Sequence, residues 1–313
     1  MRIDLAPAAA QSTIEATYKS REVEGWIDIH FYRKLGFQLA NVFVKLKMTP
    51  AAVSFLGCLF GVVAGHLYYY RNLGANIAGM LLHIGANALD NADGQLARLT
   101  NQRSRMGRVI DSVADHLIWV SIYVHLGLRC LAEGPFVAVA LLTLAAGLSH
   151  AMQGAAADYY RNGYLYFVKG RSRADFDSFA ALREEYRQLS WRGEPWKKFL
   201  LALYRNFTWQ QELLSPGLKR LRETSERNFP DEIPDWLQRR YRDCAAPMLQ
   251  WWRWLMTNPR MFLLFFLLFI GRPAWYLWLQ LTAFNFLLIY LILQQGRMSQ
   301  SLLELATARR EPA

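Results

Sequence analysis

Apolar runs long enough to cross a bilayer alternate with charged segments along the chain. Three runs contain no charged residue, at 51–70, 134–157 and 273–296, and a spanning helix needs about 20 apolar residues. A slightly shorter uncharged run at 72–89, and a run at 109–128 that is apolar apart from a few polar residues and two aspartates, complete this series. The pattern therefore predicts an all-α membrane protein.

A shorter apolar run at 261–271 decides whether the chain has five or six spans. Its eleven residues reach only about half the hydrocarbon thickness at 1.5 Å per residue, although Asn258 and Pro259 before it are typical of a helix start. If this run is a span, segments rich and poor in lysine and arginine alternate along the chain, and cytoplasmic segments hold the excess. We therefore expect six transmembrane helices, with both termini on the cytoplasmic side.

Two polar segments accompany the predicted spans. Between residues 26 and 47, apolar and basic residues mix as in a helix that lies in the membrane interface; an ordinary amphipathic packing helix is the alternative. A polar and basic segment follows the fourth span, with helical periodicity at 175–189, 195–214 and 235–256. The predicted organisation has five parts. They are an N-terminal cytoplasmic or interfacial segment (1–48), four spans that carry the candidate site (49–160), a helical cytoplasmic insertion (161–257), two spans (258–296) and a cytoplasmic tail (297–313).

Composition agrees with this division. The 313 residues are 53% hydrophobic with a mean hydropathy of +0.03, which excludes a disordered chain. The three cysteines have no paired spacing, so neither a disulfide framework nor a zinc site is indicated. Nineteen of the 36 lysines and arginines lie between residues 161 and 260. This distribution follows membrane topology, so we do not attribute the net charge of +11 to nucleic-acid binding.

Four aspartates lie within or beside the second and third predicted spans, where carboxylates are costly and therefore indicate function. Asp90 and Asp93 share one helical face, and Asp111 and Asp115 share another. A connection of fewer than twenty residues makes the two helices antiparallel neighbours, so the acidic faces can converge. Four such charges repel one another unless a cation is present, and hard divalent ions prefer oxygen ligands.

Small residues and one arginine border this acidic cleft. Gly94, Ala97 and Gly107 remove side-chain volume, which lets a bulky ligand approach the backbone; close helix packing is the alternative explanation. Arg98 offers a cation to a ligand phosphate. The full motif is Asp90-Asn-Ala-Asp93-Gly94-Gln-Leu-Ala97-Arg98, then eight residues, then Gly107-Arg-Val-Ile-Asp111-Ser-Val-Ala-Asp115.

This motif resembles the signature of the CDP-alcohol phosphotransferase family, D-x2-D-G-x2-A-R-x8-G-x3-D-x3-D, at every fixed position. The resemblance covers about residues 20–160 and 258–296 and gives no role for the insertion between them. It implies a six-span fold. It also implies transfer of a substituted phosphate from a CDP-linked donor, CDP-diacylglycerol above all, to an alcohol in phospholipid synthesis, with release of CMP.

The resemblance also implies roles for single residues. Asp115 would act as general base on the acceptor hydroxyl. A Mg²⁺ or Mn²⁺ site is implied at Asp90, Asp93, Asp111 and Asp115. The residues implied in substrate binding on the donor side are Gly94, Ala97, Arg98, Ser104 and Gly107.

One position departs from the family pattern, and the acceptor stays open. The family often has Asn where this chain has Ala51, although Ser54 keeps a hydroxyl that can contact the nucleotide. Cations near the motif can hold a phosphorylated acceptor such as inositol phosphate or glycerol phosphate; the ordinary charge of cytoplasmic flanks is the alternative. These cations are Arg103, Arg105, Arg108 and Arg161.

The first predicted span carries a stripe of glycines. Gly57, Gly61 and Gly65 form a close-packing face in the first span, which serves either a homodimer or packing within one subunit.

The rival functions are a cation or proton transporter that uses the aspartates as relay sites, and a catalytically inactive membrane scaffold. Clustering of the aspartates at one membrane face disfavours a conduction path, and the intact motif disfavours a scaffold.

Overall fold

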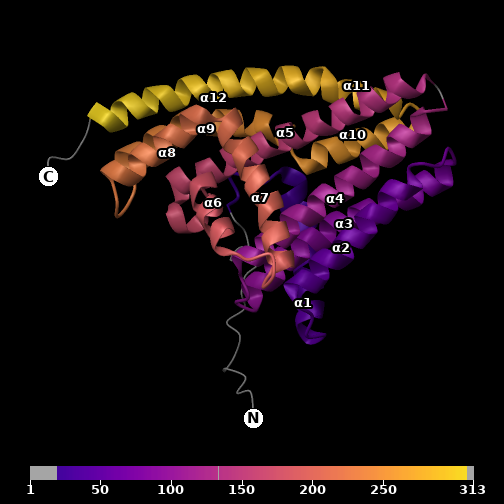
Figure 1. The fold of residues 1–313 in the computed structure, drawn as a ribbon, viewed down its shortest axis with the longest axis horizontal. Helices are drawn as coiled ribbons and strands as arrows, with labels where there is room; N and C mark the ends of the chain where they lie inside the picture. Colours follow the sequence, from indigo (N-terminus) through magenta and orange to yellow (C-terminus); the bar gives the residue numbers. More distant parts are fainter. Residues whose placement is uncertain (1–19, 133, 309–313) are drawn as a thin grey trace, which may run out of the picture.

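The computed structural model describes residues 20–132 and 134–308, and these residues form helices without a β-strand (Figure 1). Part of the predicted N-terminal segment (1–19) and the end of the predicted tail (309–313) lie outside the described residues. The helical elements are η2 (Asp28–Tyr32, π-helical), α1 (Arg33–Lys45), α2 (Pro50–Leu67), α3 (Leu73–Leu99), α4 (Arg105–Cys130), α5 (Phe136–Lys169), η3 (Arg171–Arg173, 3-10), α6 (Phe179–Gln188), α7 (Pro195–Leu214), α8 (Pro216–Asn228), α9 (Asp235–Arg253), α10 (Thr257–Phe269), α11 (Ala274–Leu281) and α12 (Ala283–Ala308).

Helices α2, α3 and α4 form the bundle that carries the motif, with α2 packed against both of the others. Each helix begins at a polar cap. The side chains of Thr49, Asn72 and Ser104 each accept a hydrogen bond from the backbone N–H three residues on, at 3.3, 3.1 and 2.9 Å. These caps fix where the helices start and therefore which face each aspartate occupies.

The glycines of the first span face their neighbours within the same chain. A Cβ added at Gly57 would lie 3.3 Å from the Leu89 Cβ on α3, and one at Gly61 would lie 2.5 Å from the Ile118 side chain on α4. Gly65 is packed against α4 in the same way. The stripe therefore serves packing within one subunit, the second of the two interpretations.

Four helical segments are long and apolar enough to cross a membrane: α2, α4, α5 and the stretch Ala274–Ala308, which includes α11 and α12. The other two predicted spans do not meet this standard. Helix α10 has 13 residues, about 20 Å at 1.5 Å per residue, and the second half of α3 carries the polar motif. The described residues confirm the all-helical fold and supply four candidate spans of a multi-pass membrane protein, and six spans stay an expectation.

Helix α1 occupies the stretch predicted to lie in the membrane interface. It packs against α3 and buries Ala40 and Phe43, as the packing alternative expects. Its opposite side exposes apolar side chains, including Val42 and Val44. An interfacial position for this helix therefore stays a prediction.

Two membrane helices continue past their predicted ends. Helix α5 reaches Lys169 and stops before Gly170, whose φ of +97° suits glycine; the aromatic side chains of its last turns are buried in the core shared with the insertion. Helix α12 continues into the predicted tail, where Ser299 and Leu302 are buried and α8 packs against it. The predicted span at 273–296 is also interrupted at Thr282, between α11 and α12.

The insertion shares a core with the membrane helices. Figure 1 shows α8 and α9 below the long α12, and α9 also packs against α5. The three predicted helices are confirmed as α6, α7 and α9 with small shifts at their ends, whereas α8 was not predicted because Leu218 and Leu221 are its only buried apolar residues. Helices α6 and α7 pack on the start of α4 through Val109, Leu182 and Leu201. The insertion therefore covers the end of the bundle at which the motif lies.

Candidate active site

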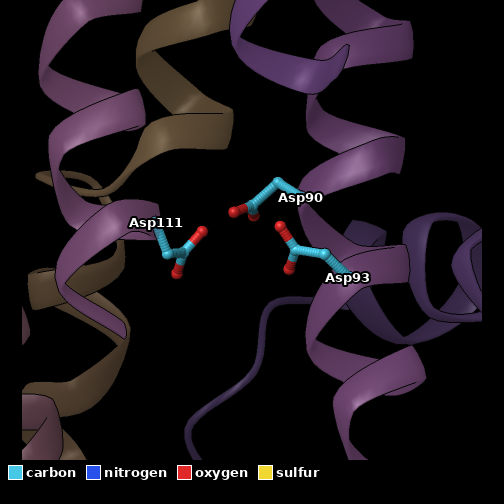
Figure 2. Close-up of side chains that lie close together, drawn as sticks. All are labelled: Asp90, Asp93 and Asp111. Atoms are coloured by element: carbon cyan, nitrogen blue, oxygen red, sulfur yellow. The ribbon is translucent and has the colours of Figure 1, made fainter. Parts of the chain in front are cut away.

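Three of the predicted metal ligands meet between two neighbouring helices. Asp90 and Asp93 project from α3, and Asp111 projects from α4 toward them (Figure 2). One carboxylate oxygen of each residue lies within 4.8 Å of the others. The short link at 100–104 brings the two acidic faces together, as the sequence predicts.

Asp115 lies one turn further along α4 and stands outside this three-carboxylate group of described residues. Its side chain is exposed and lines a cavity of about 770 Å³ bordered by α4, α5, α7 and α10. Asp111 lines the same cavity. The structure thus distinguishes a compact acidic group from a neighbouring carboxylate that a small molecule can reach.

Ser54, expected to contact the nucleotide, lies beside Asp93. Its hydroxyl donates a hydrogen bond to the Asp93 carboxylate, and the Pro50 carbonyl oxygen lies 3.1 Å away as a second acceptor. Asp93 is buried, so this hydroxyl helps to fix the orientation of its carboxylate. Ser54 therefore supports the acidic group in this structure.

The residues expected on the donor side divide into two kinds. Gly94, Ala97 and Arg98 are half-buried on α3, and the nearest atom to a Cβ added at Gly94 would be Arg98 Nη1 at 3.9 Å. Space beside Gly94 is therefore open, as a bound ligand requires. Ser104 and Gly107 instead form the N-terminal cap of α4, with the Ser104 hydroxyl accepting from the Gly107 N–H at 2.9 Å.

Two arginines expected to bind a phosphorylated acceptor are paired with carboxylates of the insertion. Arg108 contacts Asp175 at 3.0 Å and Asp177 at 3.4 Å. Arg105 contacts Asp177 at 3.1 Å and also forms an ion pair with Glu185. The structure does not place these arginines as open anion-binding groups, because the insertion supplies their counter-charges.

The other two expected acceptor-binding arginines differ in position. Arg161 lines the cavity but forms an ion pair with Asp158 at 2.5 Å. The Asp158 carboxylate also accepts hydrogen bonds from Asn162 at 3.0 Å and Gln211 at 3.1 Å. Arg103 is exposed at the link before α4 and is not among the residues that line the cavity.

The insertion holds Asp177 in place from several sides. The Tyr204 hydroxyl donates to its carboxylate at 3.0 Å, and the Arg222 guanidinium donates to its carbonyl oxygen at 3.2 Å. Burial and the neighbouring Asp177 carboxylate raise the pKa of Tyr204, so the phenol is a proton donor at neutral pH. Arg222 is itself buried and paired with Glu212 at 3.0 Å.

The acidic residues of the cavity outside the motif, Asp158, Asp175 and Asp177, were not predicted from the sequence. Asp175 and Asp177 lie in the link between η3 and α6, in a stretch that was predicted to be the start of a helix and that has no recognisable motif. The contact between Arg105 and Asp177 joins residues 72 positions apart. The only sequence signal was the presence of carboxylates within a basic insertion, which does not identify a partner.

The three-carboxylate group fits a hard divalent ion. All its donors are oxygen atoms, which Mg²⁺ and Mn²⁺ prefer, and carboxylates this close repel one another without a counter-charge. The predicted ligands that the structure groups together are Asp90, Asp93 and Asp111. The donor set suits Mg²⁺ and Mn²⁺ equally.

Comparisons with known proteins bear on the same segment. The model of the family described as CDP-alcohol phosphatidyltransferase matches residues 39–163. The archaetidylinositol phosphate synthase of Pyrococcus horikoshii is 34% identical over 85 residues, 27% of this chain and 44% of that protein. The bifunctional IPC transferase and DIPP synthase of Thermococcus kodakarensis is 26% identical over 121 residues, 39% of this chain and 27% of that protein. The chain thus spans less than half the length of these relatives, and no solved structure matches it.

Proposed function

We propose that this chain is a phosphotransferase of phospholipid synthesis, because the model of the CDP-alcohol phosphatidyltransferase family matches residues 39–163. It would transfer a substituted phosphate from a CDP-linked lipid to the hydroxyl of a polar alcohol and release CMP. The observation that carries this proposal is that Asp111, a member of the three-carboxylate group, and the accessible Asp115 line one cavity.

The acidic group would hold Mg²⁺ or Mn²⁺ through Asp90, Asp93 and Asp111. A bound divalent ion offsets the charge of a pyrophosphate and polarises its phosphoryl oxygens. Ser54 supports this group by fixing the Asp93 carboxylate. Loss of any one of the three carboxylates should therefore weaken metal binding, and turnover would fall as a consequence.

Asp115 would accept the proton of the acceptor hydroxyl while the hydroxyl oxygen attacks phosphorus. The bond from phosphorus to the CMP oxygen breaks, and CMP leaves with that electron pair. A carboxylate within hydrogen-bond reach of the hydroxyl can serve as this base. Exposure of Asp115 to the cavity, and its position outside the acidic group, support this role more than a ligand role.

The remainder of the cavity supports a lipid donor. Away from the aspartates its lining is largely apolar, and acyl chains from a bilayer can reach it because several lining side chains are exposed on α4 and α5. These side chains are Val120, Val124, Leu128, Phe136, Leu144 and Leu148. We therefore propose CDP-diacylglycerol as the donor, with its cytidine beside Gly94 and Ala97 and its pyrophosphate near Arg98.

The charge of the insertion supports a cytoplasmic position for the site. Cytoplasmic segments carry the excess of lysine and arginine, and the insertion covers the end of the bundle that carries the acidic group. We therefore propose that the site and both termini lie on the cytoplasmic side. A homodimer would need a surface other than the first-span glycines, because helices of the same chain fill the space beside them.

A cation or proton transporter and an inactive scaffold are the rival functions. A transport path needs polar groups through the depth of the membrane, whereas the cavity is polar near the aspartates and apolar at its other end. A scaffold requires neither a clustered acidic group nor an accessible Asp115. Both rivals predict that no CMP is formed.

The acceptor is a polar alcohol. Inositol phosphate and glycerol phosphate are the acceptors expected from the sequence, and the name of the Pyrococcus relative points to the first of these. Both choices depend on cations beside the motif, including Arg108 and Arg161. Because these arginines are paired with carboxylates, their presence does not by itself indicate a phosphorylated acceptor.

The test is CMP release from CDP-diacylglycerol by the purified full chain in detergent or proteoliposomes. We expect release that requires both a divalent ion and an alcohol and that stops when EDTA is added. The Asp235→Asn variant serves as a control for substitution of a carboxylate. Asp235 is 83% exposed in the insertion, so this variant should release CMP as the wild-type chain does. Absence of CMP with every alcohol, together with ion flux across the vesicle, would favour the transporter.

A further inference from the structure

The charged groups on the polar side of the cavity indicate the chemical class of the acceptor, an inference that rests on the proposed function. We infer that the acceptor alcohol carries no phosphate or other anionic group. The reason is that carboxylates of this chain already occupy the arginines that would bind one.

The first observation is the balance of charge at the start of α4. Two guanidinium groups, those of Arg105 and Arg108, face three carboxylates, those of Asp175, Asp177 and Glu185. When all five are ionised, this group of side chains carries one net negative charge. A phosphate that approached it would meet net repulsion and would have to displace a carboxylate from an arginine.

Besides Arg108, two cations line the cavity, and neither is placed to receive an anion. Arg161 forms an ion pair with Asp158 at 2.5 Å. Arg260 is 1% exposed and donates hydrogen bonds to the His150 carbonyl oxygen at 3.2 Å and to Gln153 Oε1 at 3.0 Å. Arg260 therefore presents little of its guanidinium surface to a small molecule in the cavity, and both of its terminal nitrogens already donate hydrogen bonds.

Asp177 is also anchored, so displacing its carboxylate is costly. Asp177 accepts from Tyr204 and Arg222 in addition to the arginines of α4. The link that carries it continues into α6, where the Ser178 side chain accepts from the Ala181 N–H at 3.2 Å. Bonds from three helices therefore hold Asp177 where it faces the arginines.

The same carboxylates suit an acceptor that donates hydrogen bonds. Ionised carboxylates are acceptors only, and the side chains of Asp175 and Asp177 stay 34% and 20% exposed. A hydroxyl or an ammonium group supplies donors to them, whereas an ionised phosphate supplies further acceptors and negative charge. The shared chemistry is an alcohol without an anionic group, either a neutral polyol or an amino alcohol.

The first test compares acceptors with the wild-type chain and CDP-diacylglycerol. Inositol, glycerol and ethanolamine separate neutral from ammonium-bearing alcohols, and inositol phosphate and glycerol phosphate are the phosphorylated arms. We expect at least one of the first three to be used with a kcat/KM about tenfold or more above either phosphorylated acceptor, since a bond to a charged group contributes about that factor. Preference for a phosphorylated acceptor would overturn the inference and leave the proposed function standing.

A binding measurement separates failure of the inference from failure of the proposed function. Calorimetry with inositol phosphate alone needs no turnover, and we expect no binding to the wild-type chain. The double variant Asp175→Asn, Asp177→Asn removes both carboxylates paired with Arg108 and leaves Arg105 with Glu185 alone, so it should gain binding by about tenfold or more. Binding by the wild-type chain, or no gain in the double variant, would overturn the inference even if no CMP is ever formed.

Two further variants keep this test interpretable. Glu184→Gln removes a carboxylate of α6 that is 63% exposed and lies 3.7 Å from Arg187, away from the cavity, so it should not gain inositol phosphate binding. Asp175→Asn alone keeps the anchored Asp177 and should show a smaller gain if the double variant does not fold. A gain in the Glu184→Gln control equal to that of the double variant would contradict a site at Arg105 and Arg108.

Discussion

Carboxylates face other carboxylates between α3 and α4, whereas they face guanidinium groups in the insertion. Asp90, Asp93 and Asp111 place oxygens within 4.8 Å of one another, while Asp177 and Glu212 each contact arginine. Like charges at close range need a counter-charge from elsewhere, and opposite charges supply it to each other. The first region is therefore suited to bind a ligand, and the second to hold one wall of the cavity in place.

Asp93→Asn should have the largest effect on the first region. It removes one charge from the three-carboxylate group, and we expect metal affinity to fall by more than about 100-fold, because changes outside the ligands already cost about 10- to 100-fold. Titration of Mn²⁺ into the purified protein measures this. Ser54→Ala, which removes only the partner of Asp93, should cost about 10-fold or somewhat more; equal losses in the two variants would contradict the assigned roles.

Arg222→Met breaks the second region instead. Arg222 and Glu212 are 2% and 5% exposed, and removing one partner of a buried pair costs about 3–5 kcal/mol. We expect this loss in the free energy of unfolding, measured by thermal or denaturant unfolding in detergent. Arg239→Met is the matched control, because Arg239 is 78% exposed and lies 3.9 Å from Asp235. A destabilisation of similar size in the control would refute the structural role of the buried pair.

The same contrast explains what could be predicted from the sequence. Asp90 and Asp93 share a face by helical spacing, and the short link to Asp111 leaves few ways to place the second helix, so the acidic group was predictable. Asp177 meets Arg105 across 72 positions and from an irregular link. Its partner is decided by how α6 and α7 pack on α4, which periodicity does not encode.

The parts of the fold that were predicted also depend on local sequence, and the parts that were missed depend on contacts between distant segments. Apolar runs predicted the four segments that can cross a membrane, because burial in lipid demands a local property of the sequence. The extension of α5 to Lys169 and the burial of Ser299 in α12 depend on contacts with the insertion. Those contacts form between distant segments, so the hydrophobic pattern did not predict that the helices extend past the boundaries at 160 and 297.

Gly65→Ala tests the close packing of α2 against α4. An added Cβ would lie 2.8 Å from the Ile122 backbone nitrogen, and overpacking of this kind costs about 1–3 kcal/mol. Unfolding of the variant should show this loss with no change in oligomeric state by size-exclusion chromatography. Gly296→Ala, where no atom lies within 4 Å of the added Cβ, should be neutral. Loss of a dimer in the first variant would restore the dimer interpretation.

The smallest expected effect is a pH dependence of the insertion. Burial alone would raise the pKa of Glu212, but hydrogen bonds from Lys219, the Phe179 N–H and Arg222 outweigh it and lower the pKa below the usual 4.5. Since the folded-state pKa is the lower one, this stabilisation is complete above about pH 4.5 and is lost as the pH falls through the folded-state pKa.

Unfolding temperatures measured from neutral pH downward check this dependence. The wild-type chain should lose more stability below about pH 4.5 than a Glu212→Gln variant, which has no charge to lose at this position. Parallel curves for the two proteins would show that Glu212 does not contribute.

CMP release by the Asp115→Asn variant, with metal-supported CDP binding followed in the same preparation, tests directly whether Asp115 is the base. We predict that turnover falls by about 10²–10⁴-fold or more, as loss of a general base requires, while CDP binding in the presence of Mg²⁺ or Mn²⁺ stays measurable because Asp90, Asp93 and Asp111 are intact. Undiminished CMP release by this variant would contradict the central claim that the accessible carboxylate beside the acidic group takes the proton from the acceptor.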